Sequence, residues 1–327
     1  MKRKFIKDFK EGDMVDEQFS VKLKKPPQNY KAKPGQWFEM RVADATGEIA
    51  VKYWGREGED VQKIYSSFDK GDVVRVTGTV SKFKEAFSID VDAFRGGKVL
   101  KENIYDIRDF IPTAEDIEWL GEDTERMKKE FIEIVDSIKN PEIKKVIDSF
   151  FKDPAFWKEF SDAPASMKRH SAFIHGLLHH TLNVAKICDT LSGIYPALDR
   201  DIMIGGALLH DIGKLKEFKT TTNIDMTIDG ELMGHVFMGA EMVDARCREI
   251  GTDDLVRQKL VHIVLTHHGP VENGWGSSKD PALPEAEAVF LADHSDAQVF
   301  QYLKLKHEAN TDDDWFYVRG FGHVFLK

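Results

Sequence analysis

Residues 205–218, GGALLHDIGKLKEF, place a histidine and an aspartate side by side at the end of an apolar run. Neighbouring side chains on a helix point about 100° apart, so His210 and Asp211 cannot both lie on one solvated face. At least one of them must point into the protein, where an unpaired polar group costs several kcal/mol. The doublet therefore indicates a buried site that uses both side chains, with Lys214 one turn beyond Asp211.

Further histidines and an aspartate fall where the apolar pattern predicts burial. His180 shares a helical stripe with Leu177 and Val184. A single buried histidine is more often a hydrogen-bonded core residue than a ligand, but several together favour another interpretation. The other candidates begin, end or line apolar helices, and they are His210, Asp211, His235, His267, His268 and Asp293. Seven imidazoles and carboxylates at such positions predict a metal centre, because a metal satisfies all of them.

This set resembles the HD superfamily of metal-dependent phosphohydrolases, in which His210 and Asp211 match the HD doublet. The resemblance implies two divalent ions: one held by His180, His210, Asp211 and Asp293, and one held by His235, His267 and His268 with Asp211 shared. Nitrogen and oxygen ligands without thiolate favour Mn²⁺, with Fe²⁺ and Co²⁺ as alternatives and Mg²⁺ less suited to so many imidazoles. Hydrolysis of a phosphate ester is then expected, with Asp211 and Lys214 as catalytic residues. A solvated helix end is the alternative for Lys214.

The first hundred residues alternate apolar and polar side chains with a period of two, which predicts strands. The expected strands cover residues 19–25, 37–54, 72–83 and 86–94, and the second of these turns back on itself at 44–47. A short helical segment, residues 59–68, precedes the third. Five strands with a helix between the third and fourth are the order of an OB-fold barrel.

The alternation also predicts which face of the barrel each side chain occupies. The inner face is expected to hold Phe38, Met40, Val42, Ile49, Val51 and Tyr53. The outer face is expected to hold Trp37, Arg41, Lys52 and Trp54 with Arg75 beside them, and Lys82, Phe83 and Lys84 extend the same groove. Aromatic and cationic side chains on an exposed sheet suit stacking of bases and neutralisation of phosphates, so single-stranded RNA or DNA is the expected partner. Packing of the tryptophans against a neighbouring domain is the alternative.

From about residue 106 the period is helical, and it is expected to remain so to the end. Short helices punctuated by prolines are predicted at 111–120, 124–140, 141–153 and 155–163. The sequence thus predicts a multidomain β and α protein. An N-terminal five-stranded OB-fold barrel over residues 1–105 is followed by a helical connector over 106–165 and an all-α HD domain over 166–327.

Composition and charge limit the protein class. The chain has 327 residues, 42% hydrophobic and 31% charged, which suits a soluble globular protein of about two domains. It has no apolar run of about 18 residues, so a cytoplasmic protein without membrane contact is expected. Cys188 and Cys247 lack CxxC spacing and are expected to be free thiols. Residues 1–100 hold 20 Lys and Arg against 16 Asp and Glu, and the remainder 26 against 40, which hints that the front meets a polyanion.

A narrower resemblance covers nearly the whole chain. A barrel followed by APASMKRHSAFIHGLLHHTLNVAKIC, YPALDRDIMIGGALLHDIGKLKE, GELMGHVFMGAEMV and HIVLTHHG is similar to the YhaM family of 3′→5′ exoribonucleases. The resemblance implies that single-stranded RNA, and less strongly DNA, is shortened from its 3′ end with release of nucleoside 5′-monophosphates. His179 before His180, and DHSDA after the last apolar helix, depart from the usual family pattern but leave the expected ligands intact.

Other functions and roles remain open. A nucleotide phosphohydrolase acting on dNTPs or cyclic dinucleotides would use the same ligands, whereas a non-catalytic nucleic-acid-binding protein would need only the barrel. Barrel and metal centre together favour the nuclease. His175 and His179 are expected on the polar face of their helix, and His170 and His175 near the entrance to the site. A homo-oligomer is compatible with the sequence.

Overall fold

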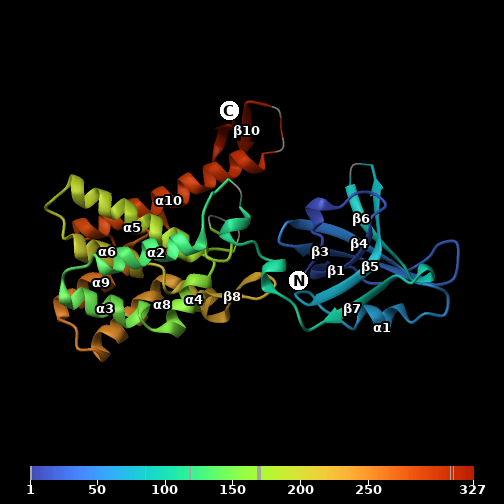
Figure 1. Cartoon of the computed structure of the whole chain (residues 1–327), viewed down its shortest axis with the longest axis horizontal. Coiled ribbons are helices and arrows are strands. Elements are labelled where there is room, and N and C mark those ends of the chain that lie inside the picture. Colours follow the sequence, from blue (N-terminus) through green and yellow to red (C-terminus); the bar gives the residue numbers. More distant parts are fainter. Residues whose placement is uncertain (1, 85, 118, 168–170, 310, 312) are drawn as a thin grey trace. The chain divides into compact units, whose positions relative to one another are not determined.

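The computed structural model describes residues 2–84, 86–117, 119–167, 171–309, 311 and 313–327. The chain divides into two compact units, drawn from blue to red along the sequence in Figure 1. One unit comprises residues 1–112 with 221–223, and the other comprises residues 113–220 with 224–327. The first is built on strands and the second mainly on helices, so the predicted combination of β and α domains is confirmed.

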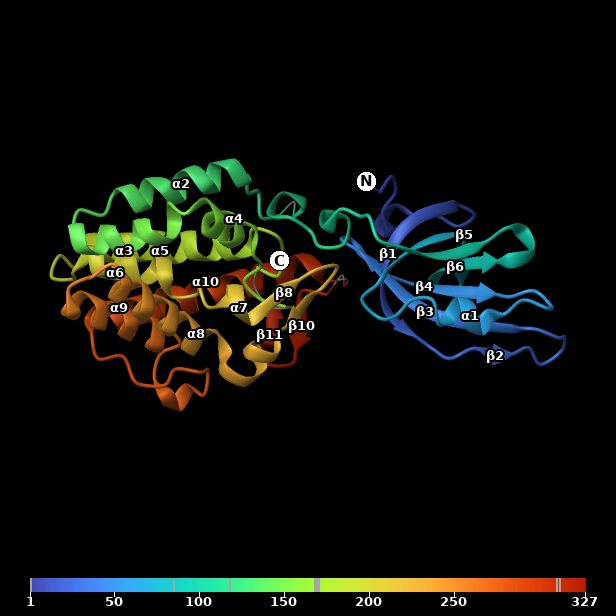
Figure 2. The same ribbon diagram turned by 90° about the horizontal axis from the view of Figure 1, so that it is seen from below.

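The first unit is a closed barrel. Its strands are β1 (Met14–Lys24), β2 (Gln28–Asn29), β3 (Gln36–Asp44), β4 (Gly47–Trp54), β5 (Val73–Phe83), β6 (Ala86–Asp92) and β7 (Lys98–Glu102), with helix α1 (Val61–Tyr65) after β4 (Figure 2). The strand order is β1-β3-β4-β6-β5, and β5 pairs again with β1 and closes the barrel. Strands β4 and β6 run parallel. This order confirms the OB-fold prediction, and β2 and β7 are additional short strands paired with β3 and β5.

The barrel interior is filled by alternate side chains of the strands. Phe38 lies opposite Tyr53, and Met40 lies opposite Val51, with no more than 2% of any of these residues exposed. Val42 and Ile49 form the next inward-facing pair along the two strands. The predicted inner face is therefore confirmed. Because successive side chains of a strand point to opposite faces, the residues between these lie on the outside.

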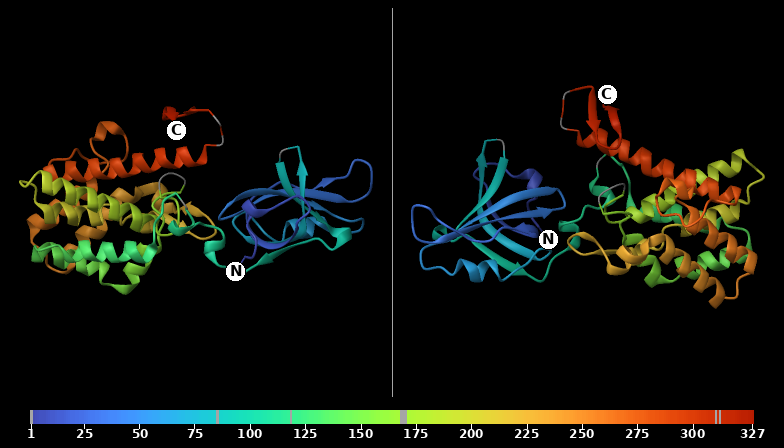
Figure 3. Two further views of the ribbon diagram at one scale, coloured as in Figure 1. Left: turned by 45° about the horizontal axis from the view of Figure 1, so that its top comes forward. Right: turned by 180° about the vertical axis from the view of Figure 1, so that it is seen from behind.

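The second unit is a bundle of helices. They are α2 (Thr124–Asp136), α3 (Pro141–Phe151), α4 (Pro154–Asp162), α5 (Gly176–Ile194), α6 (Arg200–Leu209), α7 (Lys214–Glu217), α8 (Ile228–Glu249), α9 (Asp254–Thr266) and α10 (Pro284–Glu308). Pro141 and Pro154 begin their helices in the first turn, where a missing N–H is tolerated, and Asn140 and Asp153 cap those turns. Helix α10, red in Figure 3, packs against α5 and α6.

One apolar core runs through this bundle. Phe131 of α2, Phe151 of α3 and Phe160 of α4 belong to the same cluster as Leu177 of α5 and Leu208 of α6, and each is at most 3% exposed. Residues 106–165, which the sequence assigns to a connector, thus supply three helices to the core of the helical unit. The elements that carry the candidate ligands are fixed by this packing.

Two β-hairpins interrupt the expected run of helices. Strand β8 (Phe218–Thr220) pairs with β9 (Ile224–Met226), and β10 (Trp315–Val318) pairs with β11 (Gly322–Phe325). The prediction of helix to the end of the chain is wrong there, because strands of three or four residues are too short to show their alternation. The helix predicted at 111–120 is also wrong, since the described part of that segment holds only a 3₁₀ turn at Ala114–Asp116.

Both cysteines are buried in the helical unit as free thiols, as predicted. Burial raises the pKa of Cys188 to about 12 and also raises the pKa of Cys247, so both stay protonated at neutral pH. Across the described residues, none of the helices has the length and apolar character that a membrane span would need.

Candidate metal centre and nucleic-acid face

One group of candidate ligands joins three helices of the bundle. His180 lies in the second turn of α5, His210 directly follows α6, and Asp293 lies in α10. The Nε2 atom of His180 is 3.0 Å from Asp293 Oδ1 and 3.3 Å from His210 Nε2. Both histidines are fully buried, so the three ligand atoms converge in the interior and could hold a metal ion.

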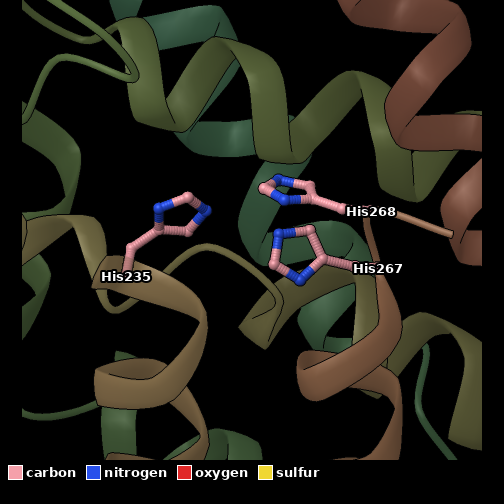
Figure 4. Close-up of side chains that lie close together, drawn as sticks. All are labelled: His235, His267 and His268. Atoms are coloured by element: carbon pink, nitrogen blue, oxygen red, sulfur yellow. The ribbon is translucent and has the colours of Figure 1, made fainter. Parts of the chain in front are cut away.

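A second group brings three histidines together from α8 and from the end of α9 (Figure 4). His267 and His268 directly follow α9, and their ring centroids are 4.2 Å apart. His235 follows Gly234, whose non-helical backbone kinks α8. The ring of His235 lies 5.1 Å from that of His268 and 5.6 Å from that of His267. These three imidazoles could hold a second ion.

Asp211 lies between the two groups and faces both. Its Oδ2 atom is 3.3 Å from His210 Nε2 and 3.4 Å from His180 Nε2. Its Oδ1 atom is 3.5 Å from His235 Nε2 and 3.6 Å from His267 Nε2, beyond good hydrogen-bond distance. Among the described residues, these last three atoms are buried without a hydrogen-bond partner. Buried unsatisfied nitrogens and a carboxylate oxygen that converge in this way fit divalent metal ions.

A glycine allows the HD turn to approach α8. A side chain at Gly213 would place its Cβ 2.0 Å from the carbonyl oxygen of His235. This contact brings Asp211 and His235, which are far apart in sequence, to within ligand distance of each other.

The other nitrogen of each ring is held by an outer group. The Nδ1 atoms are bonded as follows: His180 to Asp296 at 2.6 Å, His210 to Ala207 O at 2.7 Å, His235 to Glu217 at 2.9 Å, His267 to Val264 O at 2.7 Å and His268 to Trp275 O at 2.6 Å. Because an outer group holds Nδ1, Nε2 is the nitrogen of each ring that is left for a ligand. This is the usual arrangement of histidines that bind metals.

Electrostatics at the centre keep the carboxylates ionised. Burial alone would raise the pKa of Asp211, but Lys214 and His210 hold it well below its usual range. Burial lowers the pKa of His267, and it lowers that of His268 to about 2. His180 differs: burial opposes its protonation, but Asp211 and two further aspartates raise its pKa well above the usual value. Neutral imidazoles and ionised carboxylates are the forms that bind metals, so His180 would release a proton when an ion binds, whereas His267 and His268 are already neutral.

Two outer residues escaped the sequence analysis. Asp296 lies one turn after Asp293 on α10, and that spacing was a usable signal. Glu217 ends α7, is only 7% exposed and also accepts a hydrogen bond from the backbone N–H of His235. No pattern in the sequence marks Glu217 as a partner of a histidine 18 residues away.

The structure changes the interpretation of three nearby side chains. Lys214 is 7% exposed and its Nζ lies 2.6 Å from Asp211 Oδ2, so the alternative of a solvated helix end is wrong. His179 shares its face of the helix with Asn183, as predicted, because the Asn183 amide donates to its Nε2. That face is buried there, since His179 is 4% exposed and packs against Phe173 and Phe300. His175 bonds through Nδ1 to Ser161 O, and His170 lies outside the described residues.

The outer face of the barrel carries aromatic rings beside charges of both signs. Trp37 and Trp54 are cross-strand neighbours with stacked rings 5.3 Å apart, and Trp54 also donates to Asp90. Lys52 lies opposite Glu39 on β3 and beside Asp90 on β6. Arg41 is exposed, with Glu48 at 3.9 Å. The predicted aromatic and cationic residues do share this face, but acidic residues are interleaved with them.

The remaining predicted contact residues lie elsewhere on the barrel. Arg75 sits where β5 pairs with β1 and β7, 2.9 Å from Glu102 and 3.7 Å from Asp16, so its placement beside Arg41 is wrong. The alternation correctly put it outside but could not say which strands flank it. Lys82, Phe83 and Lys84 lie at the end of β5 in the β5–β6 hairpin, where Phe83 is 70% exposed.

Comparisons with known families agree with this architecture. A family model described as "HD domain" matches residues 177–298, and one described as "OB-fold nucleic acid binding domain" matches residues 21–95. The helical unit thus contains an HD domain over residues 177–298. Candidate ligands from His180 to Asp293 all fall within the HD domain match, and Trp37 to Arg75 fall within the OB-fold match.

Relatives with a known activity match most of the chain. The 3′-5′ exoribonuclease YhaM of Bacillus pumilus is 29% identical over 90% of this chain and 88% of that protein. The 3′-5′ exoribonuclease YhaM of Bacillus velezensis is 28% identical over 88% of this chain and 86% of that protein. The resemblance to YhaM is therefore confirmed. Among solved structures, the HD domain of the L. monocytogenes phosphodiesterase PgpH aligns with 49% of this chain and 74% of that one at 20% identity, but its TM-score of 0.28 carries no weight.

Proposed function

We propose that this protein is a metal-dependent exoribonuclease that shortens single-stranded RNA from its 3′ end, and single-stranded DNA less readily, releasing nucleoside 5′-monophosphates. The observation that carries the proposal is the position of Asp211, with one carboxylate oxygen toward each group of imidazoles. The activity for which the relatives are named, 3′-5′ exoribonuclease, supports this choice of substrate.

Two divalent ions are proposed to bind at the HD domain, with Mn²⁺ as the proposed metal for this mixed set of imidazole and carboxylate ligands. His180, His210 and Asp293 would hold one, and His235, His267 and His268 the other, with Asp211 shared. When bound, such ions polarise the phosphoryl group and activate water. The buried Lys214 adds a positive charge 2.6 Å from Asp211 and is proposed to contact the scissile phosphate.

Substrate degradation tests this function directly. A 5′-labelled single-stranded RNA incubated with Mn²⁺ is expected to give a ladder of products that shrinks from the 3′ end. DNA of the same sequence is expected to be shortened more slowly. Cleavage of a circular RNA, which has no 3′ end, would contradict the proposed exonuclease activity but not a phosphodiesterase activity. Hydrolysis of dNTPs or cyclic dinucleotides without shortening of RNA would favour the nucleotide phosphohydrolase instead.

Alanine at both Lys52 and Trp54 is expected to weaken turnover of long RNA by about ten- to a hundredfold at sub-saturating substrate. These side chains are proposed to bind the RNA strand at a distance from the reacting phosphate. Their contacts are therefore the same in the ground state and in the transition state. KM should therefore rise more than kcat falls.

A short substrate and a matched variant are the controls for this prediction. Hydrolysis of a dinucleotide should hardly change. Turnover of long RNA by Lys63→Ala, which removes an exposed cation on α1, should also stay close to wild type. Equal losses on long and short substrates would mean that Lys52 and Trp54 serve packing rather than RNA binding.

Removal of an outer carboxylate is expected to weaken one metal site selectively. Asp296→Ala frees Nδ1 of His180, and Glu217→Ala frees Nδ1 of His235. Each change should reduce the affinity of the adjacent site for Mn²⁺ by about 10- to 100-fold in a calorimetric titration. Glu287→Ala, an exposed change on α10, should leave both affinities unchanged. If both Asp296→Ala and Glu217→Ala bind Mn²⁺ with wild-type affinity, these carboxylates do not support the metal ligands.

A further inference from the structure

The loop between α9 and α10 carries an exposed tryptophan beside the candidate metal centre. The backbone oxygen of Trp275 accepts a hydrogen bond from His268 Nδ1 at 2.6 Å. The residue itself is 51% exposed. Its main chain is thus part of the outer contacts of the metal centre, while its indole faces solvent. The metal ligands do not require an indole at this position, because only the carbonyl group contacts His268.

The indole is supported from one side. Its ring stacks on that of His294, with centroids 5.1 Å apart and planes within 9° of parallel. His294 directly follows the candidate ligand Asp293, and its other neighbour is the ring of Phe290 at 5.9 Å. The imidazole therefore contacts two larger rings. One face of the indole is covered, and the exposed half of the residue remains available for a flat ligand.

Two glycines shape the loop that presents this ring. Gly274 has φ of 68° and Gly276 has φ of 109°, values that other residues rarely adopt. A Cβ at Gly276 would lie 3.6 Å from His268 Nδ1. The backbone on both sides of Trp275 therefore follows a path suited to glycine, close against the metal centre, and this path fixes the place of the indole.

We infer that Trp275 and His294 form a nucleobase subsite, on which the base of the nucleotide next to the scissile phosphate stacks. This inference rests on the proposed function and adds a specificity element to it. Stacking on an aromatic ring recognises the flat face shared by all four bases. Such a subsite suits an enzyme that removes successive nucleotides whatever their sequence. It would distinguish a nucleotide from a phosphate ester that has no base.

Binding of two small ligands tests the subsite. Adenosine 5′-monophosphate contains the base, whereas ribose 5-phosphate lacks it but keeps the phosphate. In calorimetric titrations of the Mn²⁺-loaded full chain, Trp275→Ala should bind the nucleotide about 5- to 100-fold more weakly than wild type and bind ribose 5-phosphate equally well. Trp275→Phe should recover most of the affinity, because it retains a stacking ring. Trp315→Ala, which removes a tryptophan 59% exposed on β10, should change neither affinity.

Three results would overturn the subsite: equal nucleotide affinity in wild type and Trp275→Ala, no nucleotide binding by wild type, or equal losses for both ligands. Equal losses for both ligands would mean that Trp275 acts only by positioning His268. The Trp275→Ala variant would then also contain less Mn²⁺. Failure of the subsite is separable from failure of the nuclease. A wild type that shortens RNA while Trp275→Ala binds the nucleotide normally contradicts only the subsite. A wild type that binds the nucleotide through Trp275 without shortening RNA contradicts only the nuclease.

Discussion

Replacing Asp211 with alanine is expected to lower the rate of RNA hydrolysis by more than about a thousandfold. One carboxylate oxygen of this side chain lies within 4 Å of imidazoles of the first group, and the other lies within 4 Å of imidazoles of the second group. Its loss removes a ligand from both proposed ions and also the partner of the buried Lys214. The measurement is the initial rate of shortening of a labelled single strand at saturating Mn²⁺.

Two further variants separate chemistry from folding. Asp211→Ala leaves a buried ammonium without its carboxylate, which can destabilise the HD domain. Asp211→Asn keeps the shape of the side chain and should also be inactive, while its circular dichroism and its binding of RNA stay close to wild type. Asp254→Asn changes an aspartate with an 84% exposed side chain on α9 and should keep full activity. Substantial activity in Asp211→Asn would overturn the proposed metal centre.

Full-length protein prepared with Mn²⁺ is expected to hold about two metal ions per chain, since two separate groups of ligands flank Asp211. His235→Ala should reduce the content to about one ion. Its ring contributes only to the second group, and its Nε2 is buried without a hydrogen-bond partner among the described residues. Elemental analysis after removal of free metal provides the measurement, and activity should fall in parallel with the lost ion.

Two histidines outside the metal centre provide the control for the number of bound ions. His262 and His307 lie on α9 and α10, away from the candidate ligands, and alanine at either should leave the metal content unchanged. Wild-type protein that saturates at one ion, together with a His235→Ala variant that binds as much, would show that the second group holds no metal.

Much of the barrel was predictable from local pattern. Phe38 and Met40 alternate with polar neighbours, and a strand with one buried face requires this alternation. Pairings between distant strands were predicted only through the OB-fold order. The pairing of Arg75 shows the limit: alternation placed it outside, but its neighbours Asp16 and Glu102 come from β1 and β7, which the residues around it do not specify.

The sequence by itself determined the types of ligand at the candidate site, because polar residues such as His180, His210 and Asp211 interrupt apolar helices where burial without partners would be costly. Only the tertiary structure decided how these ligands are distributed between two groups. Packing of separate helices places Asp211 between two groups of imidazoles and brings Asp296 and Glu217 behind two of the rings. A helical period states which face a residue occupies, but not which helix that face meets. That choice depends on the fit of side chains throughout the shared core, and no local stretch of sequence contains it.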